Sequence, residues 1–144
     1  MDITHAQQYY LRAIHELTMN GEGVRLSDIA AKVGVKKSST YTALKTLQRK
    51  RLVKRDASRK VHLTPEGARQ GACMAEKYTT IQRFLMRILK INSATARGDA
   101  HAMVHLVSSE TCRCLHECIG SNCSIYEASE MIAEQKDKNG LIMG

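Results

Sequence analysis

The fold is decided by residues 26–64, LSDIAAKVGVKKSSTYTALKTLQRKRLVKRDASRKVHLT. Apolar residues recur at helical spacing near its start and again in its middle, and Gly34 separates the two runs. Ser27 and Ser38 are expected to cap the two helices, Gly34 to end the first in a left-handed conformation, and Val35 to turn inward. Two short helices joined by a tight turn form a helix-turn-helix.

A wing is predicted directly after the second helix. Residues 52–55 and 60–63 alternate between apolar and polar side chains, as two short strands do, about the polar turn 56–58. Thr64, Pro65 and Glu66 then supply the cap, the first residue and the acidic first turn of another helix. The predicted fold class is mainly α, with a winged helix-turn-helix DNA-binding domain over residues 1–70 and a helical dimerisation and sensor domain over residues 71–144.

Positive charge is concentrated on this winged unit. Residues 36–69 contain eleven Lys and Arg against Asp56 and Glu66, whereas the whole 144-residue chain has a formal charge of only +8. Lys and Arg release counterions from duplex DNA, and a helix fits its major groove, so the pattern predicts binding to double-stranded DNA. The alternative is a helix-turn-helix that binds another protein and keeps a solvated basic surface.

The composition is ordinary for a globular protein, with 43% apolar residues. No apolar run approaches the roughly 20 residues that span a bilayer, and the N-terminus MDITHAQQ lacks a signal-peptide pattern, which predicts a cytoplasmic protein with no membrane partner. Four of the five cysteines lie between residues 112 and 123, and they are not typical of a secreted disulfide framework. We expect them to be thiols or metal ligands, and Cys73 to lie in the core.

The rest of the chain is predicted to be helical. Periodic apolar residues predict helices over residues 3–19, 65–89, 94–107, 108–119 and 124–136, of which 65–89 connects the two domains. These few helices cannot bury all their apolar faces alone, which predicts a homodimer and, by its two-fold symmetry, a palindromic operator. The residues of helix 94–107 that are expected to pack are Met103, Leu106 and Val107.

Five segments carry a family resemblance: residues 10–17 (YLRAIHEL), 26–30 (LSDIA), 52–53 (LV), 63–67 (LTPEG) and 105–108 (HLVS). They resemble the diphtheria-toxin-repressor family of metalloregulators, and the layout is similar to its short manganese-regulator branch. The similarity extends over about residues 6–120. It implies a homodimeric winged-helix repressor. In this family Fe(II) or Mn(II), bound between the first helix, the connecting helix and the helix near 101–105, fixes the DNA-binding heads for operator recognition.

The metal positions of the family fall on residues that mostly differ from the usual ligands. Carried over one at a time, they are Tyr9, Arg12, Tyr78, Gln82, His101, Val104 and His105. Arg12 brings a positive charge to a site for a cation, and Val104 cannot coordinate a metal. Mn(II), a hard ion that prefers carboxylate oxygens, is therefore less expected than other transition metals.

Three hypotheses for the sensor follow. In the first, His101 and His105, four residues apart on one helix face, bind Zn(II), Ni(II), Co(II) or Fe(II), and His5 or Tyr9 adds a third ligand. The same spacing also occurs in structural His pairs. In another, metal sensing is lost or has passed to a small organic ligand in a pocket lined by Tyr9, Tyr78 and Val104.

The remaining hypothesis uses the cysteines as an alternative thiolate sensor. Their spacing is C-x-C-x3-C-x4-C, which matches no common zinc-finger or ferredoxin pattern. They could hold a thiophilic metal or an iron–sulfur centre, or form a thiol switch; buried structural cysteines are the simpler interpretation. The cysteines concerned are Cys112, Cys114, Cys118 and Cys123.

The resemblance also places the contacts of the recognition helix. Hydroxyls and backbone amides at the start of this helix suit phosphates, whereas Tyr41 and Thr42 point where base edges and thymine methyls lie. The recognition contacts fall on Lys36, Ser38, Ser39, Tyr41 and Thr42. Contacts with the phosphate backbone are predicted for Lys45, Arg49, Arg55, Arg59 and Lys60.

The sequence thus predicts a cytoplasmic, homodimeric transcriptional regulator, a repressor whose operator affinity depends on metal occupancy or redox state. An enzyme using Cys or His chemistry is not expected, because the sequence contains no Gly-rich phosphate loop, paired-carboxylate site or nucleophile elbow. A protein-binding adaptor is the other alternative.

Overall fold

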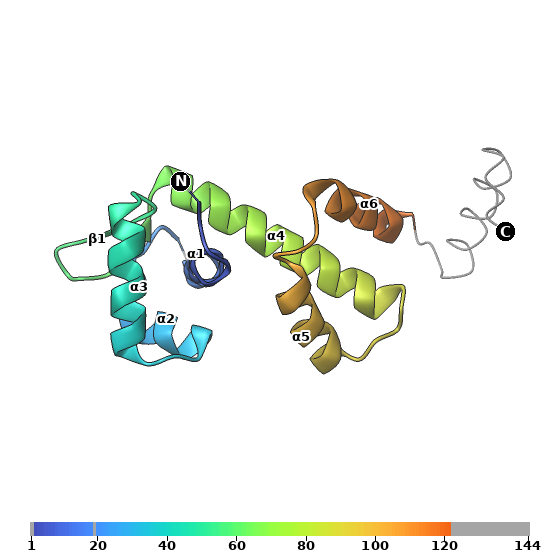
Figure 1. Cartoon of the computed structure of the whole chain (residues 1–144), viewed down its shortest axis with the longest axis horizontal. Helices are drawn as coiled ribbons and strands as arrows, with labels where there is room; N and C mark the ends of the chain where they lie inside the picture. Colours follow the sequence, from blue (N-terminus) through green and yellow to red (C-terminus); the bar gives the residue numbers. More distant parts are fainter. Residues whose placement is uncertain (1, 19, 122–144) are drawn as a thin grey trace, which may run out of the picture. The chain divides into compact units, whose positions relative to one another are not determined.

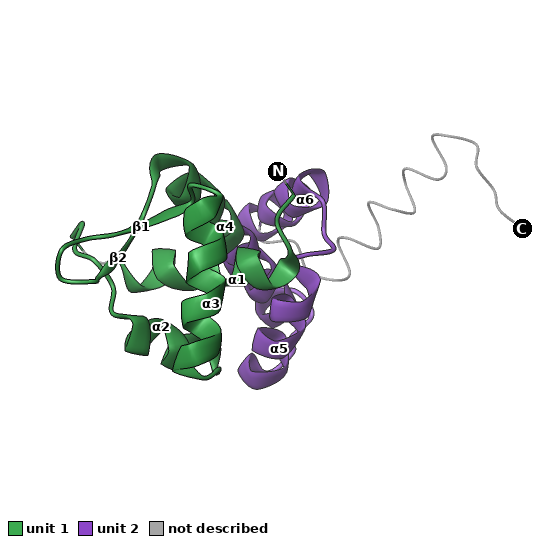
Figure 2. Ribbon diagram, turned by 60° about the vertical axis from the view of Figure 1, so that its left-hand side comes forward, with its two compact units in different colours: residues 1–76 green, residues 77–144 purple. Residues whose placement is uncertain are grey.

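The computed structural model describes residues 2–18 and 20–121, and the chain divides into two compact units, Met1–Glu76 and Lys77–Gly144 (Figures 1 and 2). The division falls within α4 (Pro65–Arg87), a continuous helix that contributes to both units. The helix expected over residues 124–136 and the thiol of Cys123 lie outside the described residues.

The first unit is a winged helix-turn-helix, as predicted. It consists of α1 (His5–Leu17), α2 (Leu26–Val33), α3 (Lys37–Arg49), the strands β1 (Val53–Arg55) and β2 (Val61–Leu63), and the first part of α4. The two strands are antiparallel, with Val53 opposite Leu63 and Arg55 opposite Val61. Val24 bridges to Val61 and ties the segment before α2 to the wing.

An aliphatic core holds this unit together. Leu11 and Ile14 of α1, Ile29 of α2, Leu47 of α3 and Val61 of β2 are all completely buried. A side chain of this size stabilises the fold by about 1.5–3 kcal/mol when it leaves water. Because α3 uses this apolar face for the core, its polar face is turned to solvent.

Glycines permit two close approaches of α4 to the rest of the first unit. A Cβ on Gly67 would collide with the carbonyl oxygen of Leu52, and a Cβ on Gly71 would lie 2.7 Å from the carbonyl oxygen of Leu11. Thr64 fixes the start of the helix, since its hydroxyl donates to the carbonyl of Arg51 at 2.7 Å and accepts from the amide of Gly67 at 3.2 Å. The first turn of α4 is thereby attached directly to the segment between α3 and β1.

The turn and helix starts of the helix-turn-helix differ in part from the prediction. Gly34 ends α2 in the left-handed conformation, with φ of 79°, as predicted. Val35 is 41% exposed and does not turn inward, because it lies in the turn and its amide completes the C-terminal cap by donating to the carbonyl of Ala30. Ser27 and Ser38 are not the caps. Each helix begins at the residue before its serine, so the serine lies in the first turn.

The caps that the chain uses instead are Arg25 for α2 and Lys36 for α3. Both residues have extended backbone conformations, and neither helix has a side chain that accepts from its first amides. The first amides of both helices therefore have no acceptor from a capping side chain.

The second unit contains the rest of α4, α5 (Ser93–Met103) and α6 (Ser109–Gly120). Asn92 and Ser108 cap α5 and α6 by accepting from the amides of Thr95 and Thr111. The buried apolar residues of this unit are Ile81, Leu85, Ile88, Ala96, Ala100 and Val104.

Two residues expected in the core are exposed. Leu106 is 80% exposed, because α5 ends at Met103 and Leu106 lies in the turn that follows. Cys73 is exposed on α4. Among residues 2–18 and 20–121, no helix has the length and hydropathy needed to cross a membrane.

Candidate nucleic-acid interface and sensor residues

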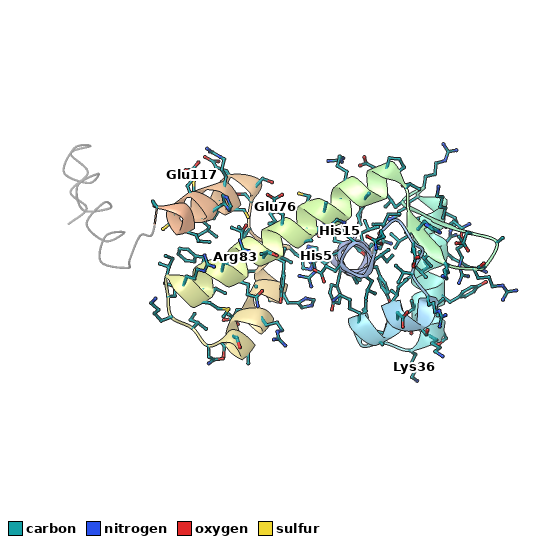
Figure 3. The ribbon with its side chains drawn as sticks, turned by 180° about the vertical axis from the view of Figure 1, so that it is seen from behind. His5, His15, Lys36, Glu76, Arg83 and Glu117 are labelled. Atoms are coloured by element: carbon teal, nitrogen blue, oxygen red, sulfur yellow. The ribbon has the colours of Figure 1, made fainter. Side chains whose placement is uncertain are left out.

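The outward face of α3 gathers the residues predicted to contact DNA. The opposite face is buried through Thr40, Leu44 and Leu47. The exposed residues are Lys36, Ser38, Ser39, Tyr41, Thr42, Lys45 and Arg49, and Lys36 lies at the turn between α2 and α3 (Figure 3). The face combines small hydroxyl side chains with cations, which suits contacts with phosphates and base edges.

Tyr41 is the one large aromatic side chain on this face, and two cations hold it. The ring is 43% exposed. Lys45 Nζ lies 4.9 Å and Arg55 Cζ 5.7 Å from its centre, which are cation–π distances. Since Arg55 belongs to β1, the ring links the recognition helix to the wing.

The turn of the wing is organised by one carboxylate. Asp56 Oδ1 accepts from the amides of Ser58 at 2.9 Å and Lys60 at 3.0 Å, and Oδ2 lies 2.8 Å from His62 Nε2. The hydrogen bond with His62, followed by the bond from the Lys60 amide, lowers the pKa of Asp56 below its ordinary value. Arg59 adopts a left-handed conformation with φ of 63° and is displayed at the exposed tip of the turn.

A cavity of about 490 Å³ opens between the wing and the N-terminal ends of α2 and α3. Five of its eight lining residues are cationic and none is acidic; the lining consists of Arg25, Leu26, Ser27, Lys37, Arg55, Ser58, Arg59 and Lys60. The structure thus brings together Arg55, Arg59 and Lys60 from the predicted set. Arg25 and Lys37 were missed as site residues, although their positions next to the two helix starts could have identified them.

On α1, the positions that the resemblance assigns to a metal hold a phenol and a guanidinium. The Tyr9 hydroxyl donates to the carbonyl of Lys32 at 3.3 Å. Arg12 is only 5% exposed, its Cζ lies 4.8 Å from the centre of the Tyr9 ring, and its Nε lies 3.8 Å from Glu16 Oε1. Glu16 also pairs with Lys32 at 3.1 Å. This part of α1 therefore already balances its carboxylate with two cations.

His5 lies in the first turn of α1 and is exposed (Figure 3). It belongs to the first unit, whereas His101 and His105 belong to the second. Its suggested part as a third ligand stays a prediction.

In the second unit, the corresponding positions supply two imidazoles. His101 is exposed near the end of α5, His105 is half-buried just after it, and their ring centres are 6.4 Å apart in a T-shaped arrangement. Val104 is buried. Two imidazoles suit Zn(II), Ni(II), Co(II) or Fe(II), whereas the carboxylate-rich set that Mn(II) prefers is not present at these positions.

The three described cysteines of the cluster lie on α6, and none of them is in a disulfide bond. Cys112 and Cys118 are half-buried and Cys114 is exposed. Within the part of the chain that the structure describes, no three His, Cys, Asp or Glu side chains are grouped so that they could hold a metal ion. The thiolate hypothesis also needs Cys123, which lies outside that part.

Two family models match the chain. One, described as "Iron dependent repressor, metal binding and dimerisation domain", matches residues 64–122. The other, described as "IclR helix-turn-helix domain", matches residues 11–57. The first match contains α4, α5 and α6, and the second contains α2, α3 and β1.

Curated relatives are similar over most of this chain. The transcriptional regulator MntR of Salmonella typhimurium (strain LT2) is 32% identical over 102 residues, which are 71% of this chain and 64% of the relative. MntR of Escherichia coli O6:H1 (strain CFT073) has the same identity over 102 residues, covering 65% of its length. The chain thus spans slightly less than two thirds of the curated relatives that it matches.

Solved structures share the fold. The manganese regulator SloR superposes with a TM-score of 0.70 and 25% identity, over 79% of this chain and 53% of SloR. IdeR of T. acidophilum has a TM-score of 0.71 at 24% identity, over 83% of this chain and 55% of IdeR. At that identity, IdeR supports the fold alone.

Proposed function

Because the chain belongs to the diphtheria-toxin-repressor family of metalloregulators, we propose that it is a homodimeric, sequence-specific, DNA-binding transcriptional regulator. Its second half matches a metal-binding and dimerisation domain, and its curated relatives are transcriptional regulators. We infer a repressor whose operator affinity depends on a metal. We do not expect it to be an enzyme. Its location in the cytoplasm stays a prediction.

The exposed basic face of the first unit is the observation that carries this proposal. Lys45, Arg49 and the wing residues Arg55, Arg59 and Lys60 supply charges that can replace the counterions of a DNA duplex. The hydroxyl residues and Tyr41 on the same side of α3 can reach base edges in the major groove. Phosphate contacts would set affinity and register, and the α3 side chains would select the sequence.

Dimerisation explains how one short helix can specify an operator. Two α3 helices related by a two-fold axis contact half-sites about one DNA turn apart, roughly 34–36 Å, and such half-sites form a palindrome. The match of residues 64–122 to a dimerisation domain supports this arrangement.

The metal is proposed to be bound by His101 and His105. SloR is described as a manganese regulator, which favours Mn(II) by similarity. The imidazole pair and the guanidinium of Arg12 instead favour a metal that accepts nitrogen ligands. When bound, the metal would add a fixed positive charge and cross-link its ligands. We therefore propose Fe(II), Zn(II), Ni(II) or Co(II), with Mn(II) as the competing ion.

The thiols of α6 are the alternative sensor. Cys112, Cys114 and Cys118 are in no disulfide bond, and Cys114 is exposed to oxidants or thiophilic metals. An iron–sulfur centre or a thiol switch would make the operator affinity depend on these residues and not on the histidines.

Operator binding with defined metals tests the proposal. The operator is first selected from a random duplex pool, and its affinity is then measured by fluorescence anisotropy, without oxygen, with chelator or with each of the five divalent ions. The activating metal is expected to raise the affinity by about 5- to 150-fold, the usual range of allosteric coupling. The paired change His101→Ala and His105→Ala is expected to remove this increase, whereas His116→Ala, at an exposed position of α6, should keep it.

Each other result has a distinct meaning. A chain with no preference for any selected duplex over random DNA is not a sequence-specific regulator. Equal affinity under all metal conditions contradicts metal dependence. Loss of the response in a Cys112→Ser, Cys114→Ser, Cys118→Ser variant, with the histidines intact, would transfer the sensor to α6.

A further inference from the structure

The ring of Tyr41 lies on the exposed face of α3, but its position is restricted by two cations. The side chain is 43% exposed. Lys45, one turn further along α3, places its Nζ 4.9 Å from the ring centre, and Arg55 of β1 places its Cζ at 5.7 Å. Each cation attracts the negative face of the ring, so together they favour one position of a side chain that would otherwise move freely at the surface.

Arg55 is itself held in place by the wing. It is paired across the sheet with Val61, which is completely buried, and directly opposed residues lie on the same face of a sheet. The stem of Arg55 therefore runs along the face that Val61 shares, and the residue is half-buried. Its Nε is buried. A guanidinium whose inner end is enclosed has few positions available, so it is a fixed support for the ring.

The chemistry of the ring suits a base and not a phosphate. A phenol carries no positive charge, whereas its apolar carbons can pack against the C5 methyl group that thymine exposes in the major groove. A ring that is already ordered in the free protein loses less conformational entropy when it makes this contact. The two cations would thus strengthen a base contact without touching the base.

We propose that Tyr41 reads the methyl group of one thymine in each half-site, and that Arg55 and Lys45 are positioning residues for its ring. The inference rests on the proposed DNA binding. It gives the wing a part in sequence selection, because Arg55 of β1 influences which base α3 prefers. Removal of either cation leaves the ring in the protein but less ordered, so the preference for thymine weakens.

The charge of these two residues also affects DNA binding, and the two effects must be measured separately. Positive charge raises the affinity for every duplex alike. The positioning role instead changes the ratio of the affinities for two duplexes that differ by one methyl group. Uracil provides this comparison, because it lacks only the C5 methyl group of thymine.

The experiment replaces the thymines of one half-site of the selected operator with uracil, one at a time, and measures affinity by competition in fluorescence anisotropy. With wild-type protein, one position is expected to lose about fourfold, the effect of returning one methyl group to water. Tyr41→Ala should abolish the loss at that position. Tyr41→Phe should retain it, because the ring remains.

Lys45→Gln and Lys54→Gln form a matched pair. Each removes one exposed lysine of the first unit. Lys54 is the neighbour of Arg55 on β1 and lies on the opposite face of the strand, away from the Tyr41 ring. Both changes should weaken binding to the thymine and the uracil operators. Lys45→Gln should also reduce the affinity ratio to about twofold or less, whereas Lys54→Gln should leave the ratio unchanged.

Variants of Arg55 test the contribution of the wing. Arg55→Gln is expected to reduce the ratio as Lys45→Gln does. Arg55→Lys keeps the charge but loses the planar group, so the salt dependence of binding should equal that of the wild type while the ratio falls. Circular dichroism and the melting temperature show whether each variant is folded. Lys45 is exposed, so Lys45→Gln decides the question even if a change at the half-buried Arg55 destabilises the first unit.

Three results overturn the inference and leave the proposed function intact. If the wild-type protein binds its operator but no uracil lowers the affinity, Tyr41 reads no methyl group. If the thymine preference persists in Tyr41→Ala, another side chain such as Thr42 reads it. If Lys45→Gln and Arg55→Gln lower both affinities equally and keep the ratio, the two cations do not position the ring. A wild-type protein that prefers no duplex contradicts the proposed function, and the inference falls with it.

Discussion

At the scale of single residues, Arg12 is the most informative difference between this chain and the family that it resembles. A guanidinium that is 5% exposed packs on the Tyr9 ring and pairs with Glu16, where the resemblance places a metal-binding carboxylate. The sequence identified the change in chemistry. It could not predict the burial, because that depends on α2, whose Lys32 carbonyl and ammonium group hold Tyr9 and Glu16.

We expect Arg12→Ala to lower the free energy of unfolding of the first unit by about 1–3 kcal/mol, because it removes a buried aliphatic stem, a cation–π contact and an ion pair. The pair itself contributes little of this, since Glu16 is 30% exposed and retains Lys32. Urea unfolding followed by circular dichroism measures the change. Arg83→Ala, at an exposed position of α4 (Figure 3), is the control and should stay within about 0.5 kcal/mol of wild type. Equal stability of the two variants would contradict a structural role for Arg12.

At the scale of secondary structure elements, local sequence rules predicted the interior of each element better than its ends. The wing strands were placed within one residue, because their alternation and the polar turn agree. The predicted starts of α2 and α3 were wrong, because the prediction relied on hydroxyl or carboxylate side chains, which are the usual helix caps. Here Arg25 and Lys36 occupy the cap positions without capping through their side chains.

The first turn of α4 is an element whose stability should depend on pH. Glu66 accepts from Arg69 at 2.6 and 3.0 Å and from Gln70 at 2.7 Å, and these bonds, that of Arg69 first, lower the pKa of Glu66 from 4.5 to about 2. A carboxyl whose pKa is lower in the folded state stabilises that state above the unfolded pKa. The stabilisation by Glu66 is therefore complete above about pH 4.5 and is lost as the pH falls towards about 2.

We expect Glu66→Gln to make the free energy of unfolding less dependent on pH over that interval, with the two proteins converging at its acid end. Chemical denaturation at a series of pH values measures this. Glu76→Gln, at an exposed position of the same helix, should retain the wild-type slope. A Glu66→Gln slope equal to that of wild type would show that the ion pair does not influence folding.

At the scale of the whole molecule, the sequence predicted two functional halves but not the surfaces that they form. The cavity is assembled from residues 25–27, Lys37 and the wing, which come together only when α2, α3 and β1 pack on a common core. The periodicity of apolar residues describes one element at a time, so it cannot predict which residues of different elements come together. The candidate sensor residues were chosen by the chemistry of their side chains. A metal site that combines ligands from the two units stays a prediction.

The second unit exposes apolar residues that could contribute to a dimer. Met86, Leu89 and Leu106 are large apolar side chains of the second unit that are 38%, 40% and 80% exposed. If they contribute to a dimer, Leu106→Asp should weaken the association by about tenfold or more, since charge at a buried interface position is costly. Sedimentation equilibrium measures the association constant. Val35→Asp, an equally drastic change at an exposed apolar residue of the first unit, should leave it unaltered. A wild-type chain that sediments as a monomer would exclude the homodimer.

The bare starts of α2 and α3 also bear on how this protein can evolve. A capping side chain at position 25 or 36 would stabilise the free chain by about 1 kcal/mol. A substitution at either position could therefore raise the stability of the protein. The same cap would occupy amides that could otherwise donate to phosphate oxygens of bound DNA. Selection for thermal resistance alone would thus be expected to erode DNA affinity at these two residues first, and a thermostabilised descendant would reveal by its caps whether it still had to regulate.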